Sequence, residues 1–432
     1  MGCLISLFRA AAAMVLFVII FVGFLSYLIL NNFSDKLLSA DFYTKTLAAE
    51  DTYNRIYDDV LLDDELKETT ERFLGDIEIV SHQEVVDLLR EIMPPEYIQS
   101  EVEGAIERTV DYINEDVDEL ELYIDLNLPL ENVKRVMLGY IDGRIDELEV
   151  VDSGISGCSP TAANDLAANF TLRFTLVSNG VVPETVPSLP AIDATCRAVI
   201  FELAYNSLVD SAGLSEAATA TLINGKGDLR TPFANGNTLG VLKVSARLLA
   251  EPLMDEAIDE VREDLTDTGQ FDLIRQIAKW DDDTTETQIR ADLADGRDWI
   301  SKASNFGDMA SLIMVIGGAA TMALIFFPTL GGMLRWPGIA LLVTGGFFFV
   351  VGKIAQSKVP DALSDAVETG AGQVSNVPPA VTDLGTDILV SFGSQLTDGF
   401  VGPSITMLTF GIILLGASFF SIILKRFIPF LK

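Results

Sequence analysis

Histidine, cysteine and basic side chains are scarce in this chain of 432 residues. One histidine and three cysteines leave little for a zinc site or a histidine-based catalytic triad. The 63 acidic residues outnumber the 29 basic ones, and a net charge of −34 would repel nucleic acid. A hydrophobic content of 49% excludes a disordered chain. A chain so acidic and so apolar must keep the two kinds of residue in separate segments.

Four apolar segments are each long enough to cross a bilayer, which takes about 20 residues. The predicted transmembrane helices are residues 10–30, 309–328, 336–355 and 401–424. Lys353 is the only ionisable residue inside them, and it lies near enough to the end of its segment to reach the interface. The first segment also resembles a signal peptide, but an anchor is favoured because the apolar run is long and no small-residue cleavage site follows it.

The charges that flank these four segments are divided by sign. One side would hold residues 1–9, 329–335 and 425–432, with five basic residues and no acidic one. The other side would hold residues 31–308 and 356–400, which together with Lys353 carry 24 basic and 63 acidic residues, a net charge of −39. The positive-inside rule therefore predicts a multi-pass cell-membrane protein with both termini in the cytoplasm. The five cytoplasmic basic residues are Arg9, Arg335, Lys425, Arg426 and Lys432.

The outward segment 31–308 is predicted to be a helix-rich α+β domain with a small antiparallel sheet. We expect helices in residues 41–149 and 201–308, and a disulfide-linked loop and strand region in 150–200. The sequence Ser81-x-x-Glu84 is a capping box that begins one helix, and Pro95 begins the next. Alternation of apolar and polar residues predicts strands at 120–128 and 170–176, with a third candidate at 239–245.

The end of the outward domain predicts a stalk that leads into the second membrane segment. A capping box formed by Asp283 and Glu286 is expected to begin a helix at about Thr285. Asn305-Phe306-Gly307 is the one break expected before the apolar segment begins. The fold class is thus an integral membrane protein, mainly α, with four transmembrane helices and one extracytoplasmic domain.

Cys158 and Cys196 are the two cysteines on the outward side, because Cys3 lies on the reducing side in this topology. We predict that they form a disulfide. The bond would close a loop of about 39 residues and stabilise the folded domain by roughly 4 kcal/mol. The alternative is two free, buried thiols.

No catalytic constellation can be recognised. His82 is expected to be a solvated residue in the first turn of a helix, with no nucleophile beside it. HExxH, GxSxG, CxxC and P-loop motifs are absent from the sequence. We therefore expect no enzymatic activity and no tightly bound cofactor.

An acidic run offers the one candidate metal site. Asp281, Asp283, Thr285 and Asp292 fall at calcium-loop offsets 1, 3, 5 and 12, but Glu286 replaces the glycine that an EF-hand needs at its turn. Helix capping explains the same residues. We predict only millimolar stabilisation by Ca²⁺ or Mg²⁺, through Asp281, Asp283 and Asp292, to be read from the melting temperature with and without a chelator.

Small residues and the absence of acids characterise the predicted membrane segments. Transporters that couple to ions carry ionisable groups at membrane depth, and apart from Lys353 near one end there are none here. Small residues allow helices to approach closely, so these faces are expected to pack together or to bind a protein partner, including a second copy. They are Gly317-Gly318-Ala319-Ala320, Gly345-Gly346, Gly411 and Gly416.

Three functions remain open at the level of sequence. The order of one span, a large outward domain and three further spans resembles that of mechanotransmission-type ABC permeases and the related cell-division permease, which implies an ATPase partner. Here the loop 329–335 is too short for the coupling helix of those permeases. The second function is a ligand-sensing receptor, which would have to signal through a separate protein.

The function that we favour is a multi-pass envelope protein whose acidic outward domain mediates binding, scaffolding or surface interaction. Its partners would be the lipid bilayer and a protein, because an acidic face attracts cationic groups. The acidity has another explanation in a salty habitat, since Asp outnumbers Glu by 37 to 26 and lysines number only 12. Equally acidic exported neighbours would point to habitat.

Overall fold

The computed structural model shows a mainly α-helical chain with a few short strands. It divides into two compact units. Unit 1 comprises residues 1–56, 100–122 and 273–432, and unit 2 comprises residues 57–99 and 123–272. The structure describes residues 2–68, 81–152, 158–178, 183–190, 192–211, 216–280, 285–327, 330–371 and 378–427.

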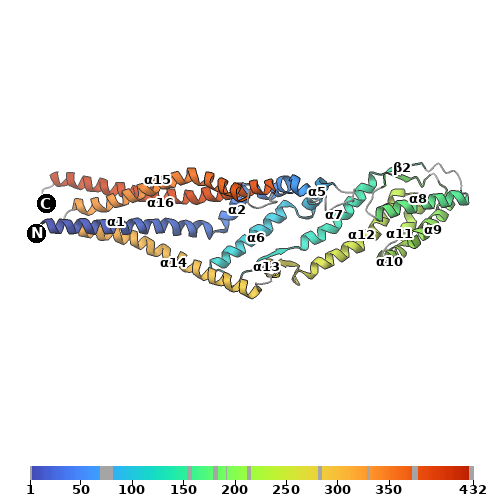
Figure 1. Ribbon diagram of the computed structural model, residues 1–432, viewed down its shortest axis with the longest axis horizontal. Coiled ribbons are helices and arrows are strands. Elements are labelled where there is room, and N and C mark those ends of the chain that lie inside the picture. Colours follow the sequence, from blue (N-terminus) through green and yellow to red (C-terminus); the bar gives the residue numbers. More distant parts are fainter. Residues whose placement is uncertain are drawn as a thin grey trace. The chain divides into compact units, whose positions relative to one another are not determined.

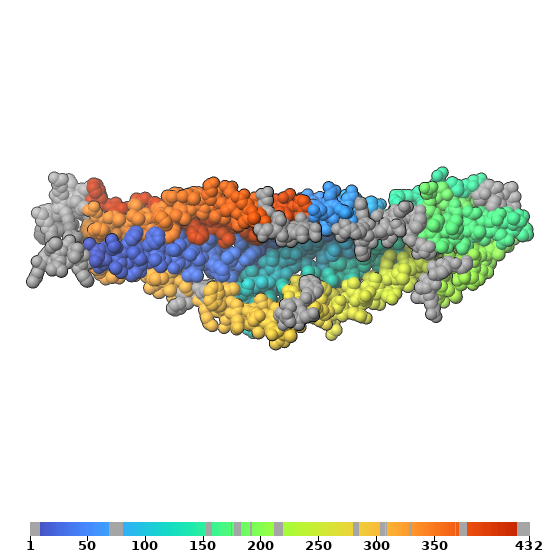
Figure 2. Space-filling view, viewed as in Figure 1, coloured from blue at the N-terminus to red at the C-terminus, as the bar shows by residue number. Residues whose placement is uncertain are grey.

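Four long helices form most of unit 1 (Figure 1). The helices α15 and α16 pack along each other as an antiparallel pair, and α1 packs against α14. Figure 2 shows the surface of α1, in blue, running beside the orange surface of α15. The long helices are α1 (Gly2–Asn32), α14 (Glu286–Ile325), α15 (Leu330–Ala371) and α16 (Pro379–Phe427). The shorter ones are η1 (Phe33–Leu37), α2 (Ala40–Ala49), α3 (Thr52–Arg55) and α13 (Leu273–Trp280).

Three of the described helices are long and apolar enough to cross a membrane. Their candidate spans are Arg9–Leu37, Gly331–Val367 and Pro379–Phe420. The first two include the first and third predicted segments, and the last covers residues 401–420 of the fourth. The second predicted segment contains a shorter apolar stretch, Met309–Ile325, at the end of α14. The helix α14 is continuous from Glu286 to Ile325, so the expected helix into the apolar stretch is confirmed and the expected break at Asn305-Phe306-Gly307 is wrong.

Glycines set the closest approaches in this helical bundle. A Cβ atom added to Gly318 of α14 would lie 2.8 Å from Ile20 of α1. One added to Gly345 of α15 would lie 2.6 Å from the backbone nitrogen of Leu408, which belongs to α16. Since real Cβ atoms need more room, these helices pack at the distance that small residues permit. Aromatic rings complete the core between α1 and α15, where Phe21 and Phe348 have ring centroids 4.9 Å apart.

Tyr53 of α3 is buried in unit 1, and its hydroxyl has no hydrogen-bond partner among the described residues. Burial, and then the nearby charge of Glu103, raises the pKa of Tyr53 from 10.0 to about 12. The folded state therefore holds this proton more tightly than the unfolded chain does. The resulting stabilisation is complete below pH 10 and is lost as the pH rises towards 12.

We predict that Tyr53→Phe will remove a phenol that titrates near pH 12 from an alkaline absorbance titration. The variant should also lose less stability than the wild type between pH 10 and 12, because phenylalanine has no proton to release. Denaturant unfolding at several pH values measures the second effect. Parallel losses in the two proteins would contradict the assignment.

Unit 2 contains a pair of helical arms. The helices α7 (Asn127–Asp146) and α12 (Thr238–Glu263) pack against each other. The strand β1 (Tyr123–Asp125), just before α7, pairs antiparallel with β4 (Gln270–Asp272), which follows α12, and Tyr123 lies opposite Asp272. The helix α5 (His82–Ile92) packs on α7, while η2 (Ile56–Val60) and α6 (Pro95–Ile113) cross the sequence boundary between the units.

The segment between the two arms folds into a helical cluster, which we call the head. Its core contains the fully buried side chains of Phe170, Leu189, Ile200 and Phe233. Two short strands, β2 (Glu149–Val151) and β3 (Thr185–Pro187), pair in parallel at one side of this cluster. The helices of the head are α8 (Pro160–Ser178), α9 (Ala194–Ser211), α10 (Glu216–Asn224) and α11 (Lys226–Ala234).

Two of the predicted strands are wrong. Residues 170–176 lie in α8 and residues 239–245 lie in α12. In α8 the buried positions 163, 166, 167 and 170 follow the helical period, so tertiary packing overrides the local alternation. The strand predicted at 120–128 is confirmed only at β1, because α7 begins at Asn127. The described strands form one antiparallel and one parallel pair instead of a single antiparallel sheet.

Candidate functional site

Cys158 and Cys196 lie at disulfide distance, with sulfur atoms 2.27 Å apart and Cα atoms 5.4 Å apart. Cys158 is exposed just before α8 begins. Cys196 is buried in the first turn of α9, where its backbone N–H donates a hydrogen bond of 3.0 Å to the carboxylate of Asp193. The pair therefore joins the start of α8 to the start of α9 within the head.

His82 begins α5 as predicted, but it is buried and not solvated. Its ring nitrogen Nε2 lies 2.7 Å from the carbonyl oxygen of Leu61. The predicted capping box is confirmed, since the Ser81 hydroxyl accepts from Glu84 N–H and the Glu84 carboxylate accepts from Ser81 N–H. These contacts give His82 a structural position at a helix start.

The predicted calcium ligands are not brought together in the part of the chain that the structure describes. Asp281 and Asp283 lie outside the described residues. Asp292 is exposed on α14, whose capping box is formed by Thr285 and Gln288 in place of the predicted Asp283 and Glu286. Among the described side chains, no group of three or more His, Cys, Asp or Glu could hold a metal ion.

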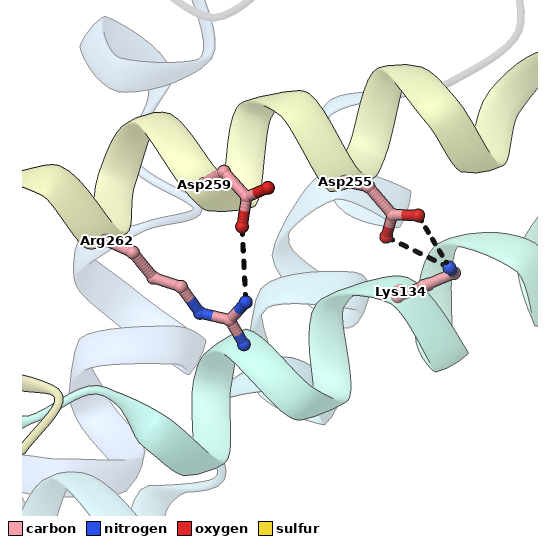
Figure 3. A network of polar contacts seen from close by, with 4 residues as sticks. All are labelled: Lys134, Asp255, Asp259 and Arg262. Atoms are coloured by element: carbon pink, nitrogen blue, oxygen red, sulfur yellow. Dashed lines mark hydrogen bonds and ion pairs between the residues drawn. The ribbon is translucent and has the colours of Figure 1, made fainter.

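Ion pairs lock the two arms of unit 2 together. Lys243 of α12 lies 2.6 Å from Asp146 of α7, and Arg247 pairs with Asp142 one turn further along. Figure 3 shows a third ion pair between the two helices, in which Lys134 of α7 contacts both carboxylate oxygens of Asp255 of α12, at 3.0 and 3.2 Å. Each such exposed pair contributes at most about 1 kcal/mol. Together they fix which face of α12 points away from α7.

That outward face is acidic and partly apolar. Glu256, Glu260 and Glu263 are exposed and have no ion-pair partner among the described residues. Leu253 lies beside them on the helix surface, with 61% of its surface exposed. We call these four residues the acidic face of α12; they fall within an arc of about 80° on the helix. Such a surface attracts a cationic partner and offers it apolar contact as well.

Unit 1 contains an apolar groove of about 740 Å³. Side chains of α1, α14, α15 and α16 all line it. Thr406 is one of its few polar side chains, and that hydroxyl already donates to the Gly402 carbonyl at 3.1 Å. The groove therefore suits a hydrocarbon ligand and offers little to a polar one. Its lining includes Phe24, Leu312, Ala320, Ala323, Leu341 and Met407.

The small residues singled out in the sequence divide between internal and open positions. Gly318, Gly345 and Gly411 lie in contacts between helices of unit 1, whereas Cβ atoms added to Gly317 or Gly416 would meet nothing within 4 Å. Much of the small-residue pattern is thus used inside the chain. The acidic face and the groove were not identified from the sequence, although the eight acids in residues 251–267 could have signalled the former.

The two ends of the long-helix bundle in unit 1 differ in charge. Arg9 and Arg335 lie where α1 and α15 begin. At the other end, Asn32 donates to the Leu396 carbonyl at 2.6 Å, and Gln356 donates to the Asp398 carboxylate. The helix α1 is about 35 Å long between Arg9 and Asn32, close to the hydrocarbon thickness of about 30 Å.

Comparisons with models of protein families, with curated proteins and with solved structures find no match for this chain.

Proposed function

We propose that this chain is a four-span membrane protein that presents an acidic, helical outward region for binding or scaffolding a cationic partner. The division of charge carries this proposal. All 63 acids lie between Asp35 and Asp398, while the five basic residues assigned to the cytoplasm flank the apolar segments on the opposite side. The positive-inside rule then places the basic side in the cytoplasm and the acidic region outside.

The packing of α14 supports a fourth span at its apolar end. Gly318 lies against Ile20, and Gly307 lies against Leu30, so α14 runs antiparallel to α1 throughout the apolar stretch. Because α1 is long and apolar enough to cross a membrane, a helix paired along it passes through the same layer. From Gly307 to Ile325 the helix covers about 27 Å, and interfacial side chains readily absorb a small mismatch.

The binding role rests on the acidic face of α12. Its three glutamates have no ion-pair partner among the described residues, and one exposed apolar side chain, Leu253, lies beside them. A basic, amphipathic surface on a partner protein would complement both properties. The permease alternative gains no support, because α14 ends at Ile325 and α15 begins at Leu330, which leaves no room for a coupling helix.

Charge reversal on the acidic face tests the binding role. Full-length protein carrying Glu256→Lys, Glu260→Lys and Glu263→Lys would be cross-linked in native membranes, and the partners identified by mass spectrometry. We expect the cross-links of α12 to a specific partner to fall about tenfold, a loss of about 1.4 kcal/mol in binding.

A matched control separates a local surface from net charge. Asp165→Lys, Glu184→Lys and Asp210→Lys change three exposed acids of the head by the same total charge. We expect this variant to keep its cross-links. Equal losses in the two variants, or no loss in either, would contradict a binding surface on α12 and would favour acidity as an adaptation to salt.

A further inference from the structure

We propose that the groove in unit 1 binds one acyl chain of an anionic phospholipid, whose headgroup lies against Arg335. The inference rests on the membrane placement proposed above, and it adds a ligand and a binding site to it. The packing of the bundle's own helices leaves this groove unfilled, with a volume of about 740 Å³.

The lining of the groove matches a hydrocarbon chain. On α14 it extends from Leu312 to Ala323, a length of about 16 Å along the helix. The small side chains of the alanines at 319, 320 and 323 leave space on the α14 side of the groove. Phe24 and Met407 line the groove from the buried core beside it. A volume within the range of about 300–1,000 Å³ is typical of sites for small molecules.

The size of the groove favours a lipid chain over a helix from another protein. A helix about 10 Å across and about 16 Å long occupies on the order of 1,300 Å³. The groove offers about 740 Å³, so a helix could lie over it but could not enter it. A flexible chain can enter and follow the irregular lining.

Charge complementarity decides which end takes the headgroup. The lining residues Met333 and Leu334 are followed directly by Arg335, which is exposed and has no ion-pair partner among the described residues. The sequence has no acid before Asp35, between Asp308 and Asp361, or after Asp398. No acid in these stretches of sequence therefore competes for Arg335, and its guanidinium is suited to a phosphate.

The neighbouring tryptophan places Arg335 at the surface of the bilayer. Trp336 is 42% exposed and stacks on Phe326 with ring centroids 5.2 Å apart. Tryptophan prefers the level of the lipid headgroups. At the opposite end of the bundle, Asp398 would repel an anionic headgroup. The site thus combines an apolar groove, a cation and an interfacial aromatic ring on adjoining turns.

Native mass spectrometry of the full-length protein tests the proposal. The protein would be incubated with equal amounts of phosphatidylglycerol and phosphatidylcholine that carry identical acyl chains. We expect one retained lipid, with about a tenfold preference for phosphatidylglycerol. Arg335→Gln should abolish the preference but keep the lipid, whereas Ala320→Phe should reduce the retention of both lipids about tenfold.

Two control variants make the same kinds of change, the loss of a cation and the addition of a phenyl ring, away from the groove. Lys353→Gln removes a cation near the acidic end, and Ala417→Phe adds the same bulk to an exposed position of α16 outside the groove. Both should bind lipid like the wild type, and their melting temperatures confirm folding. Equal retention of the two lipids by the wild type would overturn the proposal. A dimer of the wild type that Ala320→Phe disrupts would also overturn it, because a second copy of the chain would then cover the groove. An inverted topology would leave lipid retention measurable, so the two proposals can fail separately.

Discussion

Replacing Cys158 with serine is expected to lower the free energy of unfolding of the head by about 4 kcal/mol. The pair at disulfide distance has a sequence separation of 38 residues, and a crosslink over such a loop restricts the unfolded chain strongly. Cys158 is exposed whereas Cys196 is buried. Cys158→Ser therefore removes the bond without placing a new hydroxyl in the core.

Reduction of the wild-type protein provides the control for this variant. Denaturant unfolding of the reduced wild type should match that of Cys158→Ser, and reductant should leave the variant unchanged. Mass mapping without reductant should find Cys158 and Cys196 in one linked peptide pair. Alkylation of both cysteines in the unreduced protein would show that no bond is present.

Gly411→Ala is expected to lower the stability of the α15–α16 pair by about 3 kcal/mol. A Cβ atom at Gly411 would lie 2.5 Å from the backbone nitrogen of Leu342 and 2.8 Å from its Cα atom. These are backbone atoms of a neighbouring helix, so no side-chain rotation relieves the overlap. The two helices must separate, and the contacts on either side are lost with them.

Gly416→Ala is the matched control on the same helix, because a Cβ atom there would meet nothing within 4 Å. Alanine favours the helix by up to about 1 kcal/mol over glycine, so this variant should be as stable as the wild type or slightly more so. Unfolding in detergent mixtures of increasing denaturing strength would compare the variants. Equal midpoints for Gly411→Ala and Gly416→Ala would refute the close packing.

The sequence was most informative where long-range packing is not needed. Apolar length predicted three helices that the structure shows to be capable of crossing a membrane. Local hydrogen bonding predicted the start of α5 from Ser81 and Glu84, and proline predicted the start of α6 at Pro95. Redox reasoning paired the two cysteines that lie at disulfide distance.

The alternation of apolar and polar residues gave wrong strand predictions where a short segment fits both the strand period and the helical period. Phe170 and Leu172 fit the alternation of a strand, but the structure buries Phe170 and exposes Leu172 on α8. Val241, Leu242 and Ser245 are buried on one face of α12 in the same way. Seven residues cannot distinguish these periods when an amphipathic face extends beyond the window. Packing against neighbouring helices determines which of the two structures forms.

The groove of unit 1 and the acidic face of α12 could not be located from the sequence for a related reason. The groove exists because residues of four helices, among them Phe24, Ala320, Leu341 and Met407, surround one space. The acidic face of α12 is set by the opposite face of the helix, which Lys243, Arg247 and Asp255 hold against α7 by ion pairs. The groove has no contiguous motif, and the acids of residues 251–267 indicate an acidic segment but not which face of α12 is exposed.

Labelling of single cysteines on intact cells tests the central claim, a four-span chain with a basic cytoplasmic side, most directly. A membrane-impermeant maleimide would be applied to the wild type, to Asn235→Cys and to Lys432→Cys, the two variants also carrying Cys3→Ser. We predict that the cysteine at position 235 reacts in intact cells. Cys3 and the cysteine at position 432 should react only after permeabilisation. Reaction of just one terminus in intact cells would mean an odd number of spans and would contradict the account.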